Sequence, residues 1–479
     1  MNGEITAFIK QYLKDIKSHS AAVFVGAGFS KSAGYVDWRN LLRKIAEELE
    51  LDIEKESDLV SLAQYHYNAN GNRNAISNLI IDEFSKEQEI SENHKILARL
   101  PIFTYWTTNY DSLLEDALKE ANRIVDVKCK CSQLAVTKPQ RDAIVYKMHG
   151  DKECPNEAIL IKDDYERYHR QRAHFVTALS ADLISKTFIF VGFSFSDPNI
   201  SYILSRIMVD YEGQDARQHY AIMRKINKKD YSDEAEYKYA EKKFNFFRED
   251  LKRYKIKVLL VDEYSEITAI LQEISKKLNS KNIFISGSAN EYGKDFSEKE
   301  AIEFINMLSK GLIVKGYNII SGFGLGVGSA VITGALEAIY MQEKTIDDNR
   351  LLLRPFPQGI VDDKTRNELW QKYREDMISR ARISIFLFGN KLENKKVVLA
   401  NGVKSEFDIA VKQGNFIVPI GCTGYMAKQI WEEVNKDISK FYGAVDDKFK
   451  QSFAKLNIKV DNKTMVDNIL SFIGNLKNY

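Results

Sequence analysis

The chain carries two glycine-rich turns, and each follows a short apolar run directly. The first, Gly26-Ala-Gly-Phe-Ser30, follows residues 22–25, and the second, Gly322-Phe-Gly-Leu-Gly-Val-Gly328, follows residues 317–321. Glycine at the carboxyl end of a buried parallel strand lets the backbone approach a phosphate closely, and the helix that follows points its positive end at the same group. Each turn therefore predicts a strand–turn–helix unit with a site for a nucleotide-like ligand.

Short apolar runs recur between helical patterns on both sides of these turns. They lie at residues 102–108, 143–148, 187–192 and 259–262, and again at 282–288, 351–353, 383–388 and 416–419. Strand, turn and helix in repeated order are typical of parallel sheets covered on both faces. We therefore expect an α/β fold with two Rossmann-like parallel-sheet domains.

The domain boundary is predicted where the pattern restarts. A chain of 479 residues is longer than one hydrophobic core usually serves. A last helix over 267–278 is followed by Asn279-Ser-Lys281 and then by a new strand. We expect domains at 1–280 and 281–479. Within the first, the helical pattern predicts one stretch over 59–84.

Composition excludes several classes of function. Lys and Arg number 69 and Asp and Glu 67, so the net charge of +2 gives no reason to expect nucleic-acid binding. No segment approaches the roughly 18 apolar residues of a membrane span, and residues 1–20 lack a signal-peptide pattern. The four cysteines form no disulfide framework, which fits a reducing cytoplasm. Cys129 and Cys131 lack the further ligands of a zinc site, so we expect no metal.

Polar residues collect at the predicted strand ends of the first half. They occur in Gly26–Ser30, Thr107–Asp111, Met148–Asp151 and Gly192–Asn199. The carboxyl ends of parallel strands share one edge of a sheet, where ligands bind. Alone, Asn109 has the alternative of capping a helix, and His149 that of a structural turn histidine. Together, the four segments predict a binding site that contains a titratable group.

The order and spelling of these segments resemble the sirtuin family. The matching motifs, over about residues 20–265, are Gly26-Ala-Gly-Phe-Ser30, Asp37-Trp-Arg39, Thr108-Asn-Tyr-Asp111, His149-Gly150 and Gly192-Phe-Ser194. The resemblance implies an NAD+ site in which Asn109 and His149 are catalytic and flank the nicotinamide ribose. It also implies that Asp111 binds the nicotinamide carboxamide. The NAD-binding residues it implies are Gly26, Ala27, Gly28, Ser30, Asp37, Asp111, Gly192, Ser194 and Asn199.

The chain also departs from the sirtuin pattern. Protein-deacylating sirtuins have a zinc module with two C-x-x-C pairs and a neighbouring peptide-binding segment, and this sequence has no counterpart of either. That weakens protein deacylation, which stays the alternative, and favours cleavage of NAD+ itself as a substrate rather than a cofactor. The glycosidic bond to a pyridinium is already activated. His149 is suited to take a proton near neutral pH, and Asn109 to hold a water.

The second half resembles the SLOG branch of Rossmann-like folds, which bind nucleotide-derived signals. The resemblance rests on Ser286-Gly-Ser288, the second glycine turn and Arg354-Pro-Phe-Pro-Gln-Gly359. An arginine and a lysine would neutralise phosphates, and a glutamate would accept ribose hydroxyls. The alternatives are glycines that only permit close packing and charges that form surface pairs. The signal-binding residues we expect are Ser288, Gly322, Gly324, Gly326, Arg374, Lys391 and Glu406.

The two parts in this order resemble the NAD-cleaving effectors of the Thoeris antiphage systems over essentially the whole chain. In that family a TIR-domain partner makes a cyclic ADP-ribose isomer, which binds the SLOG domain and releases the sirtuin-like domain to destroy NAD+. The family forms homo-oligomers, either tetramers or filaments. The resemblance implies a cytoplasmic, signal-gated NAD+ glycohydrolase. A non-enzymatic nucleotide-binding regulator and a phosphoribohydrolase in the second half are further alternatives.

Overall fold

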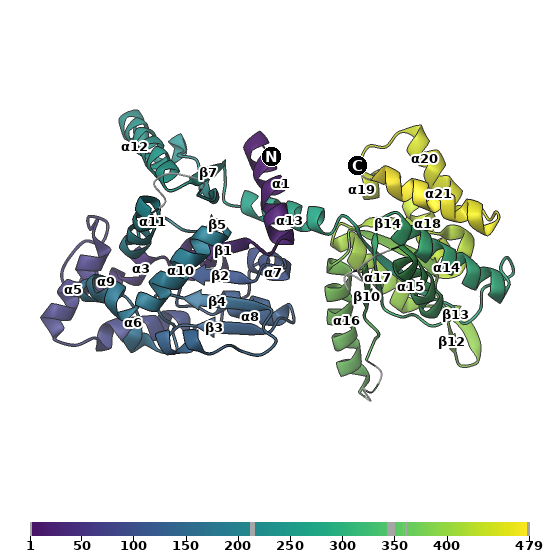
Figure 1. Ribbon diagram of the computed structural model, residues 1–479, viewed down its shortest axis with the longest axis horizontal. Helices are drawn as coiled ribbons and strands as arrows, with labels where there is room; N and C mark the ends of the chain where they lie inside the picture. The colour runs from purple at the N-terminus through teal and green to yellow at the C-terminus, as the bar shows by residue number, and fades with distance from the viewer. Residues whose placement is uncertain (1, 211–215, 343–349, 358, 360–361, 477–479) are drawn as a thin grey trace. The chain divides into compact units, whose positions relative to one another are not determined.

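The computed structural model describes residues 2–210, 216–342, 350–357, 359 and 362–476. The chain divides into two compact units, Met1–Ser275 and Lys276–Tyr479, and the division falls within helix α13 (Glu266–Leu278). Each unit is built around its own parallel sheet (Figure 1). The predicted α/β class with two parallel-sheet domains is confirmed.

The sheet of the first unit has seven parallel strands in the order β3-β4-β2-β1-β5-β6-β7. Val25 of β1 lies opposite Thr107 of β2 and Val191 of β5, and Thr107 lies opposite Lys147 of β4. The loops after these four strands therefore start at one edge of the sheet. The strands are β1 (Ala21–Val25), β2 (Thr104–Thr107), β3 (Val125–Lys128), β4 (Ala143–Lys147), β5 (Thr187–Val191), β6 (His219–Arg224) and β7 (Ile256–Val261).

Helices cover both faces of this sheet. Neighbouring residues of β2 show this, because Trp106 donates a 2.8 Å hydrogen bond to Asp182 of α10 whereas the hydroxyl of Tyr105 reaches Leu97 of α7. Besides α13, the helices are α1 (Gly3–Lys17), α2 (Ala27–Ser30), α3 (Trp38–Leu41), α4 (Arg43–Glu48), α5 (Leu59–Asn70), α6 (Asn74–Phe84), α7 (Glu92–Arg99), α8 (Leu113–Glu120), α9 (Lys162–Gln171), α10 (Ala173–Ser185), α11 (Pro198–Asp210) and α12 (Glu234–Arg253).

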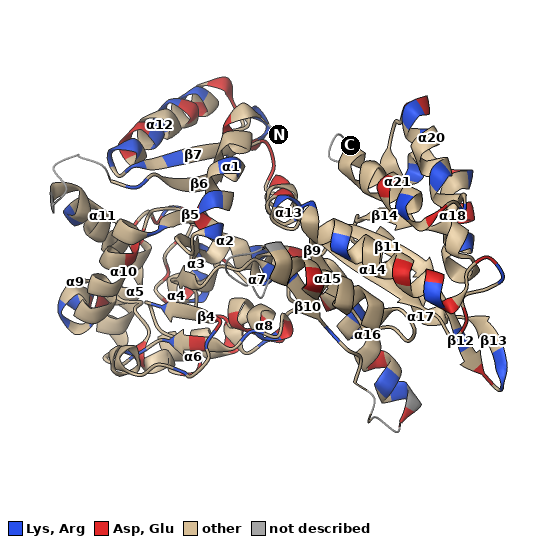
Figure 2. Ribbon diagram, turned by 45° about the vertical axis from the view of Figure 1, so that its right-hand side comes forward, with Lys and Arg blue, Asp and Glu red and all other residues tan. Residues whose placement is uncertain are grey.

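Two features of this unit differ from the sequence predictions. The single helical stretch predicted over 59–84 is wrong, because Gly71, at a φ of +66°, ends α5 and a separate helix starts at Asn74. Strands β3 and β6 were not predicted. Basic and acidic residues are interspersed along α12, the helix that follows β6 (Figure 2).

The second unit has a five-stranded parallel sheet in the order β10-β9-β8-β11-β14. A separate antiparallel hairpin joins β12 (Asn390–Glu393) to β13 (Lys396–Leu399), with both turn residues at positive φ. The sheet strands are β8 (Asn282–Ser288), β9 (Asn318–Ser321), β10 (Leu351–Leu353), β11 (Ile383–Phe388) and β14 (Phe416–Pro419). The helices are α14 (Glu298–Val314), α15 (Gly328–Gln342), α16 (Asp363–Ser379), α17 (Asn401–Lys412), α18 (Tyr425–Lys436), α19 (Ile438–Tyr442), α20 (Asp447–Ala454) and α21 (Asn462–Asn475).

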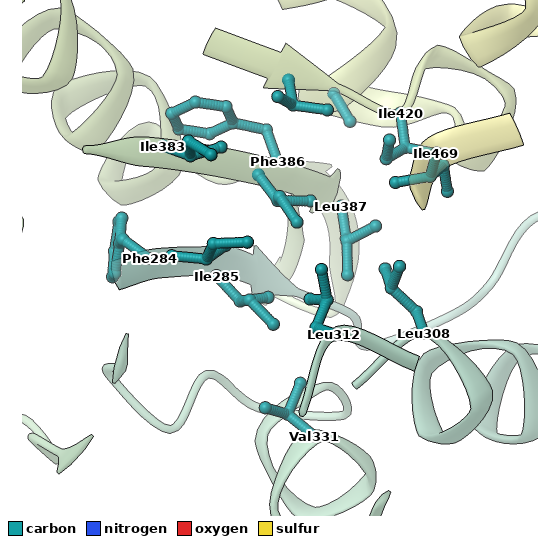
Figure 3. Close-up of a cluster of buried hydrophobic side chains, with 14 of the residues drawn as sticks. Phe284, Ile285, Leu308, Leu312, Val331, Ile383, Phe386, Leu387, Ile420 and Ile469 are labelled. Carbon is teal, nitrogen blue, oxygen red and sulfur yellow. The ribbon is translucent and has the colours of Figure 1, made fainter. Parts of the chain in front are cut away.

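The core of the second unit fills the space between this sheet and its helices. Figure 3 shows Ile285 and Leu387 of the central strands beside Leu312 of α14 and Ile469 of α21, all buried. Burying each such side chain contributes about 1.5–3 kcal/mol. This packing fixes the carboxyl ends of β8 and β9, from which the second glycine turn extends. In the part of the chain that the structure describes, no helix has the length and apolarity needed to cross a membrane.

Candidate active site and ligand site

The loop after β1 and the loop after β5 pack against each other at the carboxyl edge of the first sheet. The N–H of Gly26 donates to Val191 at 3.0 Å, and that of Gly28 donates to the carbonyl of Gly192 at 2.9 Å. A Cβ on Gly26 would lie 2.4 Å from that same carbonyl oxygen, and one on Gly192, whose φ is +63°, would lie 2.2 Å from the nitrogen of Phe29. These glycines are required by the contact between the loops, which forms the floor of a cavity.

A cavity of about 760 Å³ lies above this floor, within the first unit. This volume is in the range of ligand pockets, about 300–1,000 Å³. Gly26 and Asn199 do not line it: Gly26 lies in the loop contact, and Asn199 is buried in the first turn of α11. The predicted residues that do line it are Ala27, Gly28, Ser30, Asp37, Asn109, Asp111, His149, Gly192 and Ser194.

Asn109 follows β2 and is held by its neighbours. Its backbone N–H donates to Thr107 Oγ1 at 2.9 Å, and its side-chain Nδ2 donates to Ser30 Oγ at 3.1 Å. Helix α8 starts after Ser112, so Asn109 does not cap it. Its Oδ1 is buried and has no protein partner among the described residues. An amide fixed in this way presents a free acceptor to a water or hydroxyl in the cavity.

His149 follows β4 and is 3% exposed. Its ring meets those of Tyr165 and Tyr168 edge-on, with centroids 5.5 and 5.9 Å apart. Its Nε2 lies 3.2 Å from Oδ2 of Asp197, a residue that the sequence analysis did not single out. Burial lowers the pKa of His149, and the Asp197 carboxylate offsets part of this effect. The imidazole is therefore neutral near pH 7 and can accept a proton.

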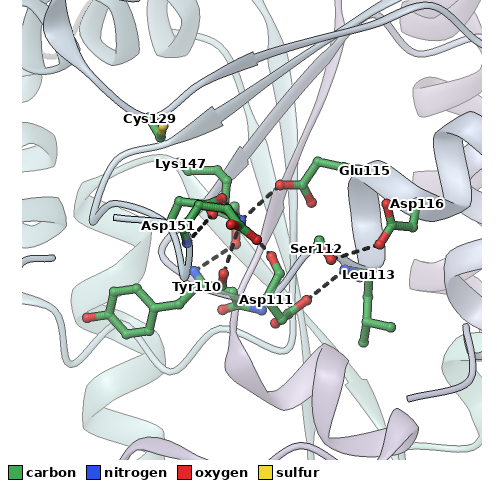
Figure 4. Close-up of polar contacts among 12 residues, drawn as sticks. Tyr110, Asp111, Ser112, Leu113, Glu115, Asp116, Cys129, Lys147 and Asp151 are labelled. Atoms are coloured by element: carbon green, nitrogen blue, oxygen red, sulfur yellow. Dashed lines mark hydrogen bonds and ion pairs between the residues drawn. The ribbon is translucent and has the colours of Figure 1, made fainter. Parts of the chain in front are cut away.

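A buried lysine organises the loop that carries Asn109. Lys147 is fully buried, and its Nζ donates to the carbonyls of Tyr110 at 3.2 Å and Asp111 at 2.6 Å (Figure 4). It also pairs with Glu115 at 2.9 Å and Asp151 at 2.5 Å. Burial alone would lower the pKa of Lys147, but the two carboxylates outweigh it and raise the pKa, so the lysine stays charged. Sequence reasoning gave Lys147 no role.

Asp111 lies beside this network and lines the cavity. Its side chain is 4% exposed, and its Oδ1 accepts the N–H of Leu113 at 3.0 Å. Burial raises the pKa of Asp111, against the opposing charge of Lys147. The carboxyl group therefore lies where it can bind a ligand amide, although its assignment to the nicotinamide carboxamide stays a prediction.

In the second unit the structure brings two of the expected charged residues together. The Nε of Arg374 on α16 lies 3.5 Å from Oε1 of Glu406 on α17, and Ser286 Oγ donates to Glu406 Oε2 at 2.6 Å. The guanidinium also lies over the rings of Phe356 and Trp370, 5.0 and 5.8 Å from their centroids. Burial raises the pKa of Glu406. A partly buried arginine that lies over two aromatic rings is suited to an anionic or planar ligand.

Lys391 does not join this pair. It lies in the β12–β13 hairpin, its side chain is 43% exposed, and its Nζ pairs with Glu393 at 3.1 Å. Ser288 Oγ donates to the carbonyl of Asn390 at 3.0 Å, which ties the end of β8 to the start of the hairpin. Lys391 therefore directly follows Asn390, which Ser288 holds in place, but its ammonium group pairs with Glu393.

The glycines of the second turn have a packing role. A Cβ on Gly324 would lie 1.9 Å from the carbonyl oxygen of Gly287, and one on Gly326, at a φ of +72°, would lie 2.1 Å from that of Ala289. A Cβ on Gly322 would approach Phe356 to 3.0 Å. The turn packs closely against the end of β8, so its glycines alone do not indicate a ligand.

The four cysteines, Cys129, Cys131, Cys154 and Cys422, are free thiols. Within the described ranges, no group of three or more His, Cys, Asp or Glu side chains is arranged to hold a metal ion.

Comparison with known proteins identifies the family of each unit and of the whole chain. Residues 104–246 match the model of the SIR2-like domain, and residues 266–476 match the Sir2- and TIR-associating SLOG family. The chain is 52% identical to the NAD(+) hydrolase ThsA of Bacillus cereus (strain MSX-D12), covering 100% of both chains. It is 49% identical to that of Cytobacillus dafuensis, over 91% of this chain and 89% of the relative. It is 46% identical to that of Acinetobacter baumannii (strain 532279), over 95% of each. These matches confirm the expected resemblance: the chain belongs to the ThsA family, with a SIR2-like first unit and a SLOG second unit.

Proposed function

We propose that this protein is an NAD+ glycohydrolase that cleaves NAD+ to ADP-ribose and nicotinamide in the cavity of its first unit. The observation that carries the proposal is that Asn109 and His149 line the same cavity of about 760 Å³, in a chain whose full-length relatives are named NAD(+) hydrolase. The loop glycines bring backbone to the cavity floor, where a pyrophosphate can approach it closely.

The chemistry asks little of the protein. The bond between ribose and the nicotinamide nitrogen breaks as the pyridinium leaves with its electron pair, and the sugar develops oxocarbenium character. The free Oδ1 of Asn109 accepts a hydrogen bond from the attacking water and orients it. The neutral imidazole of His149 takes the proton of that water as its oxygen bonds to the sugar. Asp111 holds the carboxamide of the departing ring.

The second unit is a sensor in this proposal. Its ligand is a cyclic ADP-ribose isomer made by a TIR-domain partner, and Arg374 pairs with a phosphate while Glu406 accepts ribose hydroxyls. Two observations support this: the description of the matched family as Sir2- and TIR-associating, and the pair of the partly buried Arg374 with the buried Glu406. The signal activates only if it binds the active state more tightly than the resting one. The active protein is a cytoplasmic homo-oligomer, a tetramer or a filament.

Nicotinamide release from NAD+ by the full-length protein, with and without cyclic ADP-ribose isomers, tests the proposal. Asn109→Ala and His149→Ala should lose at least about 10²-fold in rate, whereas His174→Ala, an exposed histidine on α10, should not. Activity of His149→Ala equal to wild type would refute the mechanism. An acyl-lysine peptide added with NAD+ tests the deacylase alternative, which predicts release only when the peptide is present.

The sensor assignment has its own test. Arg374→Ala should lose the response to the isomer, and Lys372→Ala, an exposed residue on the same helix, should keep it. An unchanged response of Arg374→Ala would remove the sensor claim without touching the NAD+ chemistry.

A further inference from the structure

The two carboxylate oxygens of Asp197 make contacts with two different parts of the structure. Its Oδ1 accepts the backbone N–H groups of Asn199 at 2.9 Å and Ile200 at 3.0 Å, which caps the start of α11. Its Oδ2 lies 3.2 Å from Nε2 of His149, and its side chain is 10% exposed. Pro198 follows it at the first helical position, where proline favours helix initiation. One carboxylate thus holds a helix end and faces the proposed catalytic imidazole.

Capping does not require the charge. Asparagine and serine cap helices about as well as aspartate, because each offers one oxygen to the free N–H groups. The cap uses Oδ1, so the second oxygen and the negative charge are left for another purpose. The contact with His149 is the one that a neutral capping residue would not supply.

Other charged groups near His149 are already engaged. Asp164 raises its pKa from farther away, but that carboxylate pairs with Arg73 at 2.8 Å. Arg172 lowers the pKa of His149, and the guanidinium of Arg172 donates to the carbonyls of Cys129 and Glu157.

The remaining neighbours of the imidazole are neutral. Tyr165 and Tyr168 of α9 present their rings edge-on, and burial raises the pKa of both hydroxyls well above the usual value. Among the residues that the structure describes, Asp197 is the charged group in ion-pair contact with His149.

We propose that Asp197 is a positioning residue for NAD+ hydrolysis: it fixes the ring of His149 and stabilises the imidazolium that forms during the reaction. The inference rests on the proposed function. Nε2 of His149 lies at ion-pair distance from the carboxylate and has no hydrogen-bond partner among the described residues. Asp197 therefore acts on the ring through its charge, and Nδ1 is the nitrogen left to take the proton from water. The water oxygen bonds to the ribose carbon, nicotinamide leaves with the electrons of the broken bond, and Asp197 stays ionised throughout.

Asp197→Asn separates capping of α11 from the charge beside His149, since it keeps the capping oxygen and removes the charge. In the full-length protein, with the cyclic ADP-ribose isomer that activates wild type most strongly, kcat should fall roughly 10²-fold with little change in KM. The acid limb of kcat/KM, followed from about pH 5 to about pH 9, should move to lower pH, because loss of a neighbouring anion favours the neutral imidazole. A residue that only maintained structure would not move this limb.

Asp233→Asn is the matched control. Asp233 caps α12 in the same way, through Oδ1 to the N–H groups of Ala235 at 2.7 Å and Glu236 at 2.8 Å, at an exposed position. Its rate and pH profile should equal those of wild type. Asp197→Ser, a second uncharged cap, repeats the test if the asparagine variant folds poorly.

The outcomes are distinct. Wild-type kcat in Asp197→Asn, or a lower kcat with an unmoved acid limb, would overturn the positioning role. Wild-type protein that releases no nicotinamide with any isomer would instead overturn the proposed function, and this inference with it.

Discussion

Replacing Lys147 by methionine should destabilise the first unit strongly. Methionine matches the length of lysine but removes the cation that contacts Glu115 at 2.9 Å, Asp151 at 2.5 Å and two buried carbonyls. Removing one partner of a buried ion pair costs about 3–5 kcal/mol, and each orphaned carbonyl adds about 1 kcal/mol. A domain stable by about 5–15 kcal/mol loses much of its margin. We expect the midpoint of its thermal transition to fall by about 10 °C or more.

The assay is calorimetric unfolding of the full-length variant beside two controls. Lys119→Met removes a lysine that is 62% exposed and pairs with Asp116 on the surface, and should cost at most about 1 kcal/mol. Adding Glu115→Gln to Lys147→Met removes one of the buried carboxylates left without its cation and should restore part of the lost stability. If Lys147→Met lowered the thermal midpoint no more than Lys119→Met does, the buried cation could not be what holds the Asn109 loop.

Three further predictions concern other parts of the molecule. Burial lowers the pKa of His219 to about 4, so the unfolded chain, with a pKa near 6.5, takes up the proton first and about 3 kcal/mol of stability is lost as pH falls through this window. His219→Asn should reduce the difference in urea midpoint between pH 7 and about pH 5. Gly192→Ala forces a Cβ to 2.2 Å from Phe29 and should abolish hydrolysis and lower the melting temperature, whereas Gly414→Ala, at a φ of +72° with open space around it, should cost only about 1 kcal/mol. Arg374→Ala should weaken binding of the cyclic ADP-ribose isomer at least about 10-fold by calorimetry, because a charge-assisted hydrogen bond contributes about 1.5–3 kcal/mol.

Most of the sheet could be predicted because buried parallel strands are continuous apolar runs, as β5 and β11 show. Strand β3, with the sequence Val-Asp-Val-Lys, lacks that pattern because it lies at the edge of its sheet. Strand β6 has a short apolar centre, and the basic stretch from Arg224 onward concealed its end. The break at Gly71 depends on one left-handed residue, which periodicity does not register.

The candidate site was predictable where it follows from strand ends and was hidden where it depends on distant contacts. Asn109 and His149 each follow a strand, so topology alone brings them to one edge. Lys147 contacts a carbonyl 36 residues away in sequence, and its role appears only in the folded structure. Asp197 has the local pattern of a helix cap, which conceals its second contact.

Signal-gated NAD+ cleavage is tested most directly by following NAD+, ADP-ribose and nicotinamide together by proton NMR, in one tube, with the full-length protein and cyclic ADP-ribose isomers. We expect one isomer to start a stoichiometric conversion of NAD+ to both products in wild type and His174→Ala, and we expect His149→Ala to leave NAD+ intact. Conversion by His149→Ala at the wild-type rate would refute the role of His149, and no conversion by wild type with any isomer would refute signal-gated NAD+ cleavage.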